Sequence, residues 1–147
     1  MKRYMTLALM SAVLLTACTS SLRTFEAVDS SNKTITVPPG GGLTGAVKEA
    51  LANDGWKIVV YRGPEVTQRG AGDPTRLERF KTFKTRYALF IQWRQVDIGC
   101  AFFGPGYSFD ISMVDNDTST EVLTLTGRGC EGGVVDKFRD ALKTPKS

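Results

Sequence analysis

Hydrophobic and polar positions alternate along most of the second half of the chain. Every second residue is apolar in residues 87–93, and Phe90 breaks the alternation by adding an apolar residue on the other side. The alternation returns in residues 107–113 and 123–126. A period of two is typical of strands in a sheet that has one face in the core and the other in water. Residues 115–118, Asp-Asn-Asp-Thr, predict a hairpin turn between the last two strands, because Asp and Asn side chains bond nearby main-chain groups.

Two other segments repeat their apolar residues at helical spacing. The first contains Leu43, Val47, Ala50 and Leu51, and Gly55 follows as a stop signal. The second has an apolar stripe with Glu131 near its start and Lys143 at its end, which suits the helix dipole. The members of that stripe are Val134, Val135, Phe138, Ala141 and Leu142.

The remaining elements are shorter. Residues 56–61, WKIVVY, predict a buried strand. The first strand lies in residues 22–28 or in residues 34–37, where Thr and Ile alternate with β-branched neighbours. Residues 63–74 are rich in Gly, Pro and charged residues and predict a loop. Residues 75–84 are ambiguous: they either contain a short helical turn or have no regular structure.

The order of these elements predicts an α+β fold. We expect a single domain with a mainly antiparallel sheet and two helices packed on one face, because one face of the strand-rich part is polar. The predicted boundaries are residues 1–17 for a signal peptide, residues 18–33 for a lipid anchor and tether, and residues 34–147 for the domain.

The N-terminus has the pattern of a secretory signal. Lys2 and Arg3 precede an apolar stretch, residues 6–16, whose 11 residues are too few to span a hydrocarbon core of roughly 30 Å. Leu15-Thr16-Ala17-Cys18 then resembles the lipobox of bacterial lipoproteins. An ordinary cleaved signal with an incidental cysteine is the alternative.

The lipobox resemblance implies a fate and a location. Cys18 would carry a diacylglyceryl group, the preceding peptide would be cleaved, and the new N-terminus would be acylated. Because each buried methylene contributes about 0.8 kcal/mol, several acyl chains hold a protein on a membrane. Thr19, rather than aspartate, follows the cysteine. In this family that favours the outer membrane, with the domain facing the periplasm.

A second resemblance concerns the order of elements. The segments TRYALFIQW, YSFDISMVDNDTSTEVLTLTGRG and VDKFRDAL follow one another as strands and a final helix. This order is similar to that of small envelope lipoproteins, among them the lipopolysaccharide-assembly lipoprotein LptE and the N-terminal domain of TolB. The resemblance covers residues 43–142 and contains no specific motif, so it assigns no functional residue.

Length and charge limit the possible partners. Removal of residues 1–17 would leave 130 residues, enough for one domain with a substantial core. The two cations lost with the signal would lower the net charge from +4 to +2. Such a small excess does not argue for nucleic-acid binding, so no nucleic-acid partner is expected.

The cysteines predict a disulfide. With Cys18 assigned to lipid, Cys100 and Cys130 remain, and two thiols left in an oxidising periplasm usually pair. A redox pair or a reactive thiol is the weaker alternative. The spacing is not Cys-x-x-Cys, and the chain has no histidine to lower a thiol pKa.

Positive charge is concentrated in the middle of the chain. Between Lys57 and Arg94, nine basic residues stand against three acidic ones. We predict that this segment contacts anionic lipid head groups, lipopolysaccharide phosphates or an acidic partner. A solvated face whose aromatic residues belong to the core is the alternative. The candidate residues are Arg76, Arg79, Lys81, Lys84 and Arg86.

Several kinds of chemistry find no support in the sequence. The absence of histidine removes Ser-His-Asp and Cys-His catalysis and the common zinc sites. The run GGGLTG, residues 40–45, lacks the Lys of a phosphate loop and is interpreted as a turn and helix start. Residues 115–121 lack the spacing of a calcium loop. Asp97 and Asp110 are a weak candidate for a carboxylate pair.

We therefore predict no catalytic residues, no metal and no cofactor. The favoured function is that of a lipid-anchored cell-envelope protein with a binding, assembly or structural role in the periplasm. Its expected partners are the membrane, through the lipid, and an envelope protein or an anionic lipid. The alternative is a carrier or sensor of an anionic amphiphile such as lipopolysaccharide or phospholipid. An enzyme is the third and least favoured class.

Overall fold

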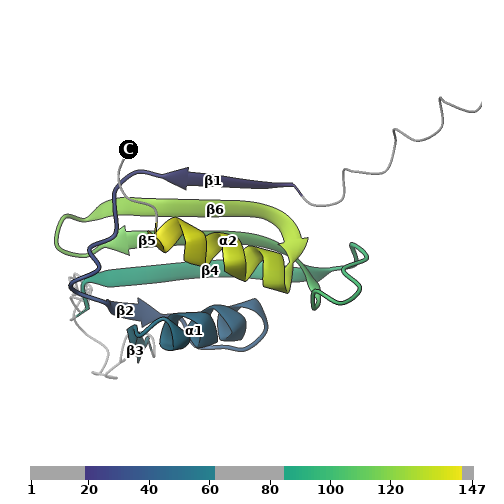
Figure 1. The fold of residues 1–147 in the computed structure, drawn as a ribbon, viewed down its shortest axis with the longest axis horizontal. Coiled ribbons are helices and arrows are strands. Elements are labelled where there is room, and N and C mark those ends of the chain that lie inside the picture. Colours follow the sequence, from purple (N-terminus) through teal and green to yellow (C-terminus); the bar gives the residue numbers. More distant parts are fainter. Residues whose placement is uncertain (1–18, 62–84, 144–147) are drawn as a thin grey trace, which may run out of the picture.

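A computed structural model of the chain describes residues 19–61 and 85–143 (Figure 1). These residues form a six-stranded sheet in the order β1-β6-β5-β4-β2-β3 and two helices that lie on one face of it. The predicted α+β domain with two helices on one face is therefore confirmed. The elements are β1 (Ser20–Thr24), β2 (Thr34–Val37), α1 (Leu43–Asn53), β3 (Lys57–Val60), β4 (Tyr87–Val96), β5 (Gly106–Asp115), β6 (Thr120–Cys130) and α2 (Glu131–Lys143).

Strands β4, β5 and β6 form the antiparallel centre that the alternating pattern predicts. The register of β4 and β5 runs from Tyr87 opposite Asp115 to Val96 opposite Gly106. The β5–β6 turn is closed by the Asp115 side chain, whose Oδ1 accepts the main-chain N–H of Asp117 at 2.9 Å. This is the side-chain bond expected of an Asp at a tight turn.

The other half of the sheet is built on a parallel unit. Strand β2 pairs in parallel with β3 on one side and with β4 on the other. Helix α1 makes the crossover that two parallel strands require. The sheet is consequently mixed, although most of its pairings are antiparallel.

The core lies between the sheet and the two helices. Leu43, Val47 and Leu51 of α1 and Phe138 of α2 are buried there against inward side chains of the sheet. The sheet contributes Ile35, Val37, Tyr87, Leu89, Tyr107, Phe109, Ile111, Met113, Leu123 and Leu125. The helical stripes and strand alternations of the sequence therefore meet in one core.

An ion pair joins the two helices. The guanidinium of Arg139 in α2 donates to both carboxylate oxygens of Asp54, at 2.6 and 2.8 Å, just after the end of α1. Hydrogen bonds from this guanidinium hold the pKa of the Asp54 carboxyl below its ordinary value. The pair is partly exposed and connects elements that are 85 residues apart in sequence.

The start of the folded part differs from the prediction. Residues 18–33 were expected to form a tether, but strand β1 within them pairs with β6 along its whole length, from Ser20 opposite Gly127 to Thr24 opposite Leu123. Of the two candidate first strands, residues 34–37 are β2, and residues 22–28 overlap β1 only in part. The sheet begins at Ser20.

Candidate interaction surfaces

The loop between β4 and β5, residues 97–105, is fastened to the start of α2. The Sγ atoms of Cys100 and Cys130 lie 2.08 Å apart, so the structure brings the two predicted disulfide partners together. Two main-chain bonds add to this link: the N–H of Glu131 donates to the carbonyl oxygen of Pro105 at 2.9 Å, and the N–H of Gly132 donates to that of Phe103 at 3.2 Å. The loop is thus held at several points along its length.

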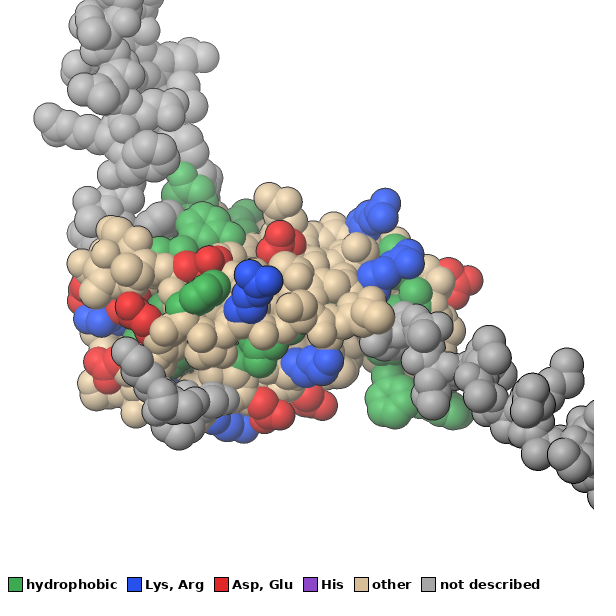
Figure 2. All heavy atoms as spheres, turned by 90° about the horizontal axis from the view of Figure 1, so that it is seen from above, with side chains coloured by type: hydrophobic (Ala, Val, Ile, Leu, Met, Phe, Trp, Pro, Cys, Tyr) green, Lys and Arg blue, Asp and Glu red, His purple; other side chains and the backbone are tan. Residues whose placement is uncertain are grey.

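This loop carries two phenylalanines into solvent. Phe102 is 100% exposed and Phe103 is 68% exposed, which is unusual for side chains of this size. Figure 2 shows a hydrophobic protrusion at the end of the domain where β1 begins. Sequence reasoning read this part of the chain only as a turn. The available signal was a pair of adjacent phenylalanines beside Gly104-Pro105-Gly106, with no partner in any alternating pattern.

A small apolar hollow lies beside the loop. It has a volume of about 210 Å³, and Phe103 and Val134 contribute to its walls. Ser20, at the start of β1, lines the same hollow together with Arg128 and Lys137. The Nζ of Lys137 donates to the Ser20 hydroxyl. The loop, the start of β1 and two cations therefore meet at one end of the sheet.

The structure removes Arg86 from the predicted anionic-surface site. Its guanidinium donates to the Asp115 carboxylate at 2.6 and 3.0 Å and also to Asp117. Asp115 has a nearly buried side chain, so this cation closes the hairpin rather than facing a ligand. The other four candidates, Arg76, Arg79, Lys81 and Lys84, lie outside the described residues, as does Cys18.

The outer face of the sheet, opposite the helices, is rich in hydroxyl groups. Thr124 donates to Glu121 Oε1 at 2.5 Å, and Ser112 donates to the same oxygen. These bonds lower the pKa of the Glu121 carboxyl, since they favour its charged form. An open depression of about 510 Å³ covers this region, and Arg23 and Asp110 also line it. This part of the outer face is therefore polar.

The candidate carboxylate pair is not assembled. Asp97 follows the end of β4, where Val96 lies opposite Gly106. Asp110 lies four residues farther along β5, opposite Gln92. Four residues of strand span about 13 Å, so the two carboxylates are well separated along the sheet.

The glycine run before α1 provides space for an aromatic ring. Gly42 has a φ of 56°, and a Cβ there would lie 2.5 Å from the ring of Trp93. The indole Nε1–H of Trp93 donates to the Thr44 hydroxyl at 3.0 Å. The run is therefore a turn and helix start, as expected, and Trp93 occupies the room that its missing side chains leave.

An apolar groove follows β4 on the outer face. Its volume is about 350 Å³, and it is lined by Pro38, Tyr61 and Phe90 among others. Beside it lies the edge strand β3, where Val59 and Val60 are close to half exposed. Among residues 19–61 and 85–143 no strand pairs with the outer edge of β3.

The part of the chain that the structure describes offers neither a metal site nor a membrane-spanning helix. No group of three Cys, Asp or Glu side chains there could hold a metal ion. No helix in this part of the chain combines the length and the apolar character needed to cross a membrane.

Known proteins resemble this chain in fold but not in sequence. No family model matches the chain, and neither does any curated protein. The structure is similar to PelC of Paraburkholderia phytofirmans. A dodecamer of a PelC point variant is 15% identical over 85% of this chain and 97% of PelC, with a TM-score of 0.55. A second PelC dodecamer is 15% identical over 87% of this chain and 100% of PelC, with a TM-score of 0.50. At such low identity the likeness concerns the fold alone.

Proposed function

We propose that this chain is a lipid-anchored cell-envelope protein whose domain associates with copies of itself to form an assembly. The observation that carries the proposal is Leu15-Thr16-Ala17-Cys18, placed after a positive start and an apolar stretch too short to span a bilayer. A lipid on Cys18 would hold the domain at the membrane, facing the periplasm.

Exposed apolar side chains support the assembly role. Large hydrophobic side chains at least 37% exposed occur on or directly after both edge strands and on β4. They are Leu22, Phe25, Val59, Val60, Tyr61, Phe90 and Trp93. The outer edge of β3, unpaired among residues 19–61 and 85–143, is also a ready site for pairing with another chain. The PelC proteins that share this fold are dodecamers, which adds support.

The carrier of an anionic amphiphile remains the second candidate. The groove along β4 is apolar, and a volume of about 350 Å³ falls in the range of small-molecule sites. The groove is only partly enclosed, whereas a carrier needs to bury most of its ligand. We therefore favour assembly.

Intact mass and native mass spectrometry test the two halves of the proposal separately. Protein isolated from membranes should have lost residues 1–17 and gained acyl chains, and Cys18→Ser should release it from the membrane. A bare Cys18 would overturn the anchor.

The acylated protein in mild detergent should then give an oligomer by native mass spectrometry. Val59→Asp on the β3 edge should dissociate it, because burying an unpaired charge at an apolar contact is costly. Thr118→Asp adds the same charge at the exposed β5–β6 turn and serves as the matched control. A monomeric wild-type protein would overturn the assembly role.

A further inference from the structure

The linker between Cys18 and the folded domain is very short. Only Thr19 separates Cys18 from Ser20, the first residue of β1. Thr19 is itself held, since its carbonyl oxygen accepts the N–H of Arg128 at 2.8 Å. At up to 3.6 Å per residue, the Cα atoms of Cys18 and Ser20 are at most about 7 Å apart. A lipid on Cys18 would therefore place the start of β1 in contact with the head groups.

The same end of the sheet presents the exposed phenylalanines. β4 ends there and β5 begins there, so the loop that joins them lies beside the start of β1 (Figure 1). The hollow shared by Ser20 and Phe103 shows that loop and strand are direct neighbours. An orientation that brings Ser20 to a bilayer thus brings Phe102 and Phe103 there as well.

The loop suits insertion into the boundary between head groups and acyl chains. Its links to α2 fix its shape before it meets the membrane, so little ordering entropy is lost on binding. An aromatic side chain buries 150–250 Å² when it leaves water, about enough for a tenfold or larger gain in partitioning.

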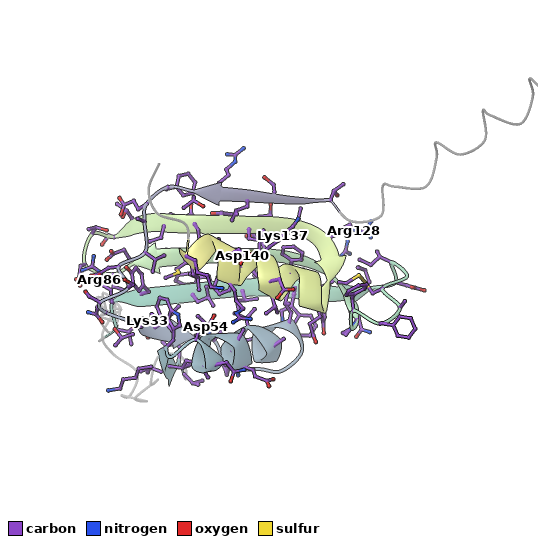
Figure 3. All side chains as sticks on the ribbon, viewed as in Figure 1. Lys33, Asp54, Arg86, Arg128, Lys137 and Asp140 are labelled. Carbon is purple, nitrogen blue, oxygen red and sulfur yellow. A yellow bond between two sulfur atoms is a disulfide. The ribbon has the colours of Figure 1, made fainter. Side chains whose placement is uncertain are left out.

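Two cations complete the surface. Arg128 comes directly after Gly127, the residue that pairs with Ser20. Figure 3 shows Arg128 at the end of the domain where β1 begins. Lys137 reaches this site from α2 and bonds to Ser20. Long basic side chains beside apolar ones let the stems lie near the acyl boundary while the charges meet lipid phosphates.

We propose that this end of the domain is a membrane-contact surface, with Phe102 and Phe103 inserted into the bilayer and Arg128 and Lys137 at the phosphates. The inference rests on the proposed lipid anchor at Cys18. It adds an orientation: the strands rise from the membrane, and the β3 edge and the outer sheet face stay clear of the lipid.

Tryptophan fluorescence in liposomes tests this orientation. Phe102→Trp would be introduced into the full acylated protein and reconstituted in vesicles of phosphatidylcholine and phosphatidylglycerol, with or without brominated acyl chains. After subtraction of the wild-type signal from Trp56 and Trp93, the added emission should shift to the blue and be largely lost in the brominated vesicles. Phe103→Trp provides a second reporter on the same loop.

Phe90→Trp is the matched control, because Phe90 is also an exposed phenylalanine. It lies six residues before the end of β4, about 20 Å from the proposed contact, so its emission should not be quenched. Quenching of Phe90→Trp but not of Phe102→Trp would mean that the domain lies on its outer face. A blue shift at Phe102→Trp without quenching would mean contact with another protein copy. Either result would overturn the membrane-contact surface.

The mass of the same sample separates the two proposals. Acylated protein with an unquenched Phe102→Trp would leave the anchor standing and reject the orientation. Protein without acyl chains would reject the anchor and, with it, the inference.

Discussion

Replacement of Gly127 by Ala should detach the start of the chain from the sheet. Gly127 has a φ of 139°, which side-chain-bearing residues rarely adopt, and a Cβ there would lie 2.2 Å from the carbonyl oxygen of Thr19. It would also lie 2.6 Å from the Cα of Ser20. Both obstacles are main-chain atoms, so they cannot yield by changing a rotamer.

The cost has two parts. Holding alanine in a conformation reserved for glycine costs about 1–3 kcal/mol. Moving β1 away removes the bond between Arg128 and Thr19, worth about 1 kcal/mol, and weakens the next pair. We expect β1 to open about 2–4 kcal/mol more easily, which corresponds to roughly thirtyfold to a thousandfold faster amide exchange in this strand.

Hydrogen exchange followed by mass spectrometry measures the effect directly. Peptides covering β1 should exchange much faster in Gly127→Ala, while those of β4 and β5 should change little. Gly133→Ala is the control, because a Cβ at Gly133 meets nothing within 4 Å. Gly133 lies in the first turn of α2, so that alanine should stabilise by at most about 1 kcal/mol. Equal β1 exchange in both variants would refute the reasoning.

Two further predictions concern the links that hold the domain together. The double variant Cys100→Ala, Cys130→Ala should lower the free energy of unfolding by about 3–4 kcal/mol, because the disulfide joins residues that are 30 positions apart. Unchanged unfolding in urea would contradict this prediction, as would alkylation of both cysteines in protein that has not been reduced. Asp54→Asn should destabilise near neutral pH, since Arg139 holds the folded-state pKa of Asp54 below 3.8. That contribution is present above the unfolded-state pKa and is lost as the pH falls through the lowered value, so the stability difference in urea should shrink in acid and not in base.

The elements with a buried face could be predicted from sequence. In β5, apolar residues alternate with polar neighbours, and all four apolar side chains face the core of the domain: Tyr107, Phe109, Ile111 and Met113. The stripe around Phe138 and the end charges of α2 were likewise sufficient to place that helix. In each case burial imposes a period on the side chains, and the period can be read without knowing the partner.

What the sequence does not reveal is which elements lie next to one another. β2 is inserted between β3 and β4 in parallel, and no periodicity distinguishes this from an antiparallel pairing. β1 was predicted only in part, as one of two alternatives for the first strand, because its only large apolar side chain, Leu22, is exposed and the strand has no buried period. Its position depends instead on the space left by Gly127, a feature visible only in three dimensions.

The loop between β4 and β5 was not recognised as a candidate site from sequence, for a related reason. Exposed phenylalanines in a turn follow no repeat, and their meaning depends on the neighbouring start of β1. The excess of basic residues between Lys57 and Arg94 was a weak guide to a binding surface, because Arg86 is neutralised by Asp115 and Asp117. A sum of charges along the chain does not show which cations already have internal partners.

The pairing of β1 with β6 has a consequence for the order of folding. Ser20 lies opposite Gly127, so these partners are 107 residues apart. The β4–β5–β6 meander, in contrast, connects segments that are close in sequence and can form early. The first strand to be synthesised would thus be the last to dock, and its site would be complete only after nearly all of the polypeptide had been made.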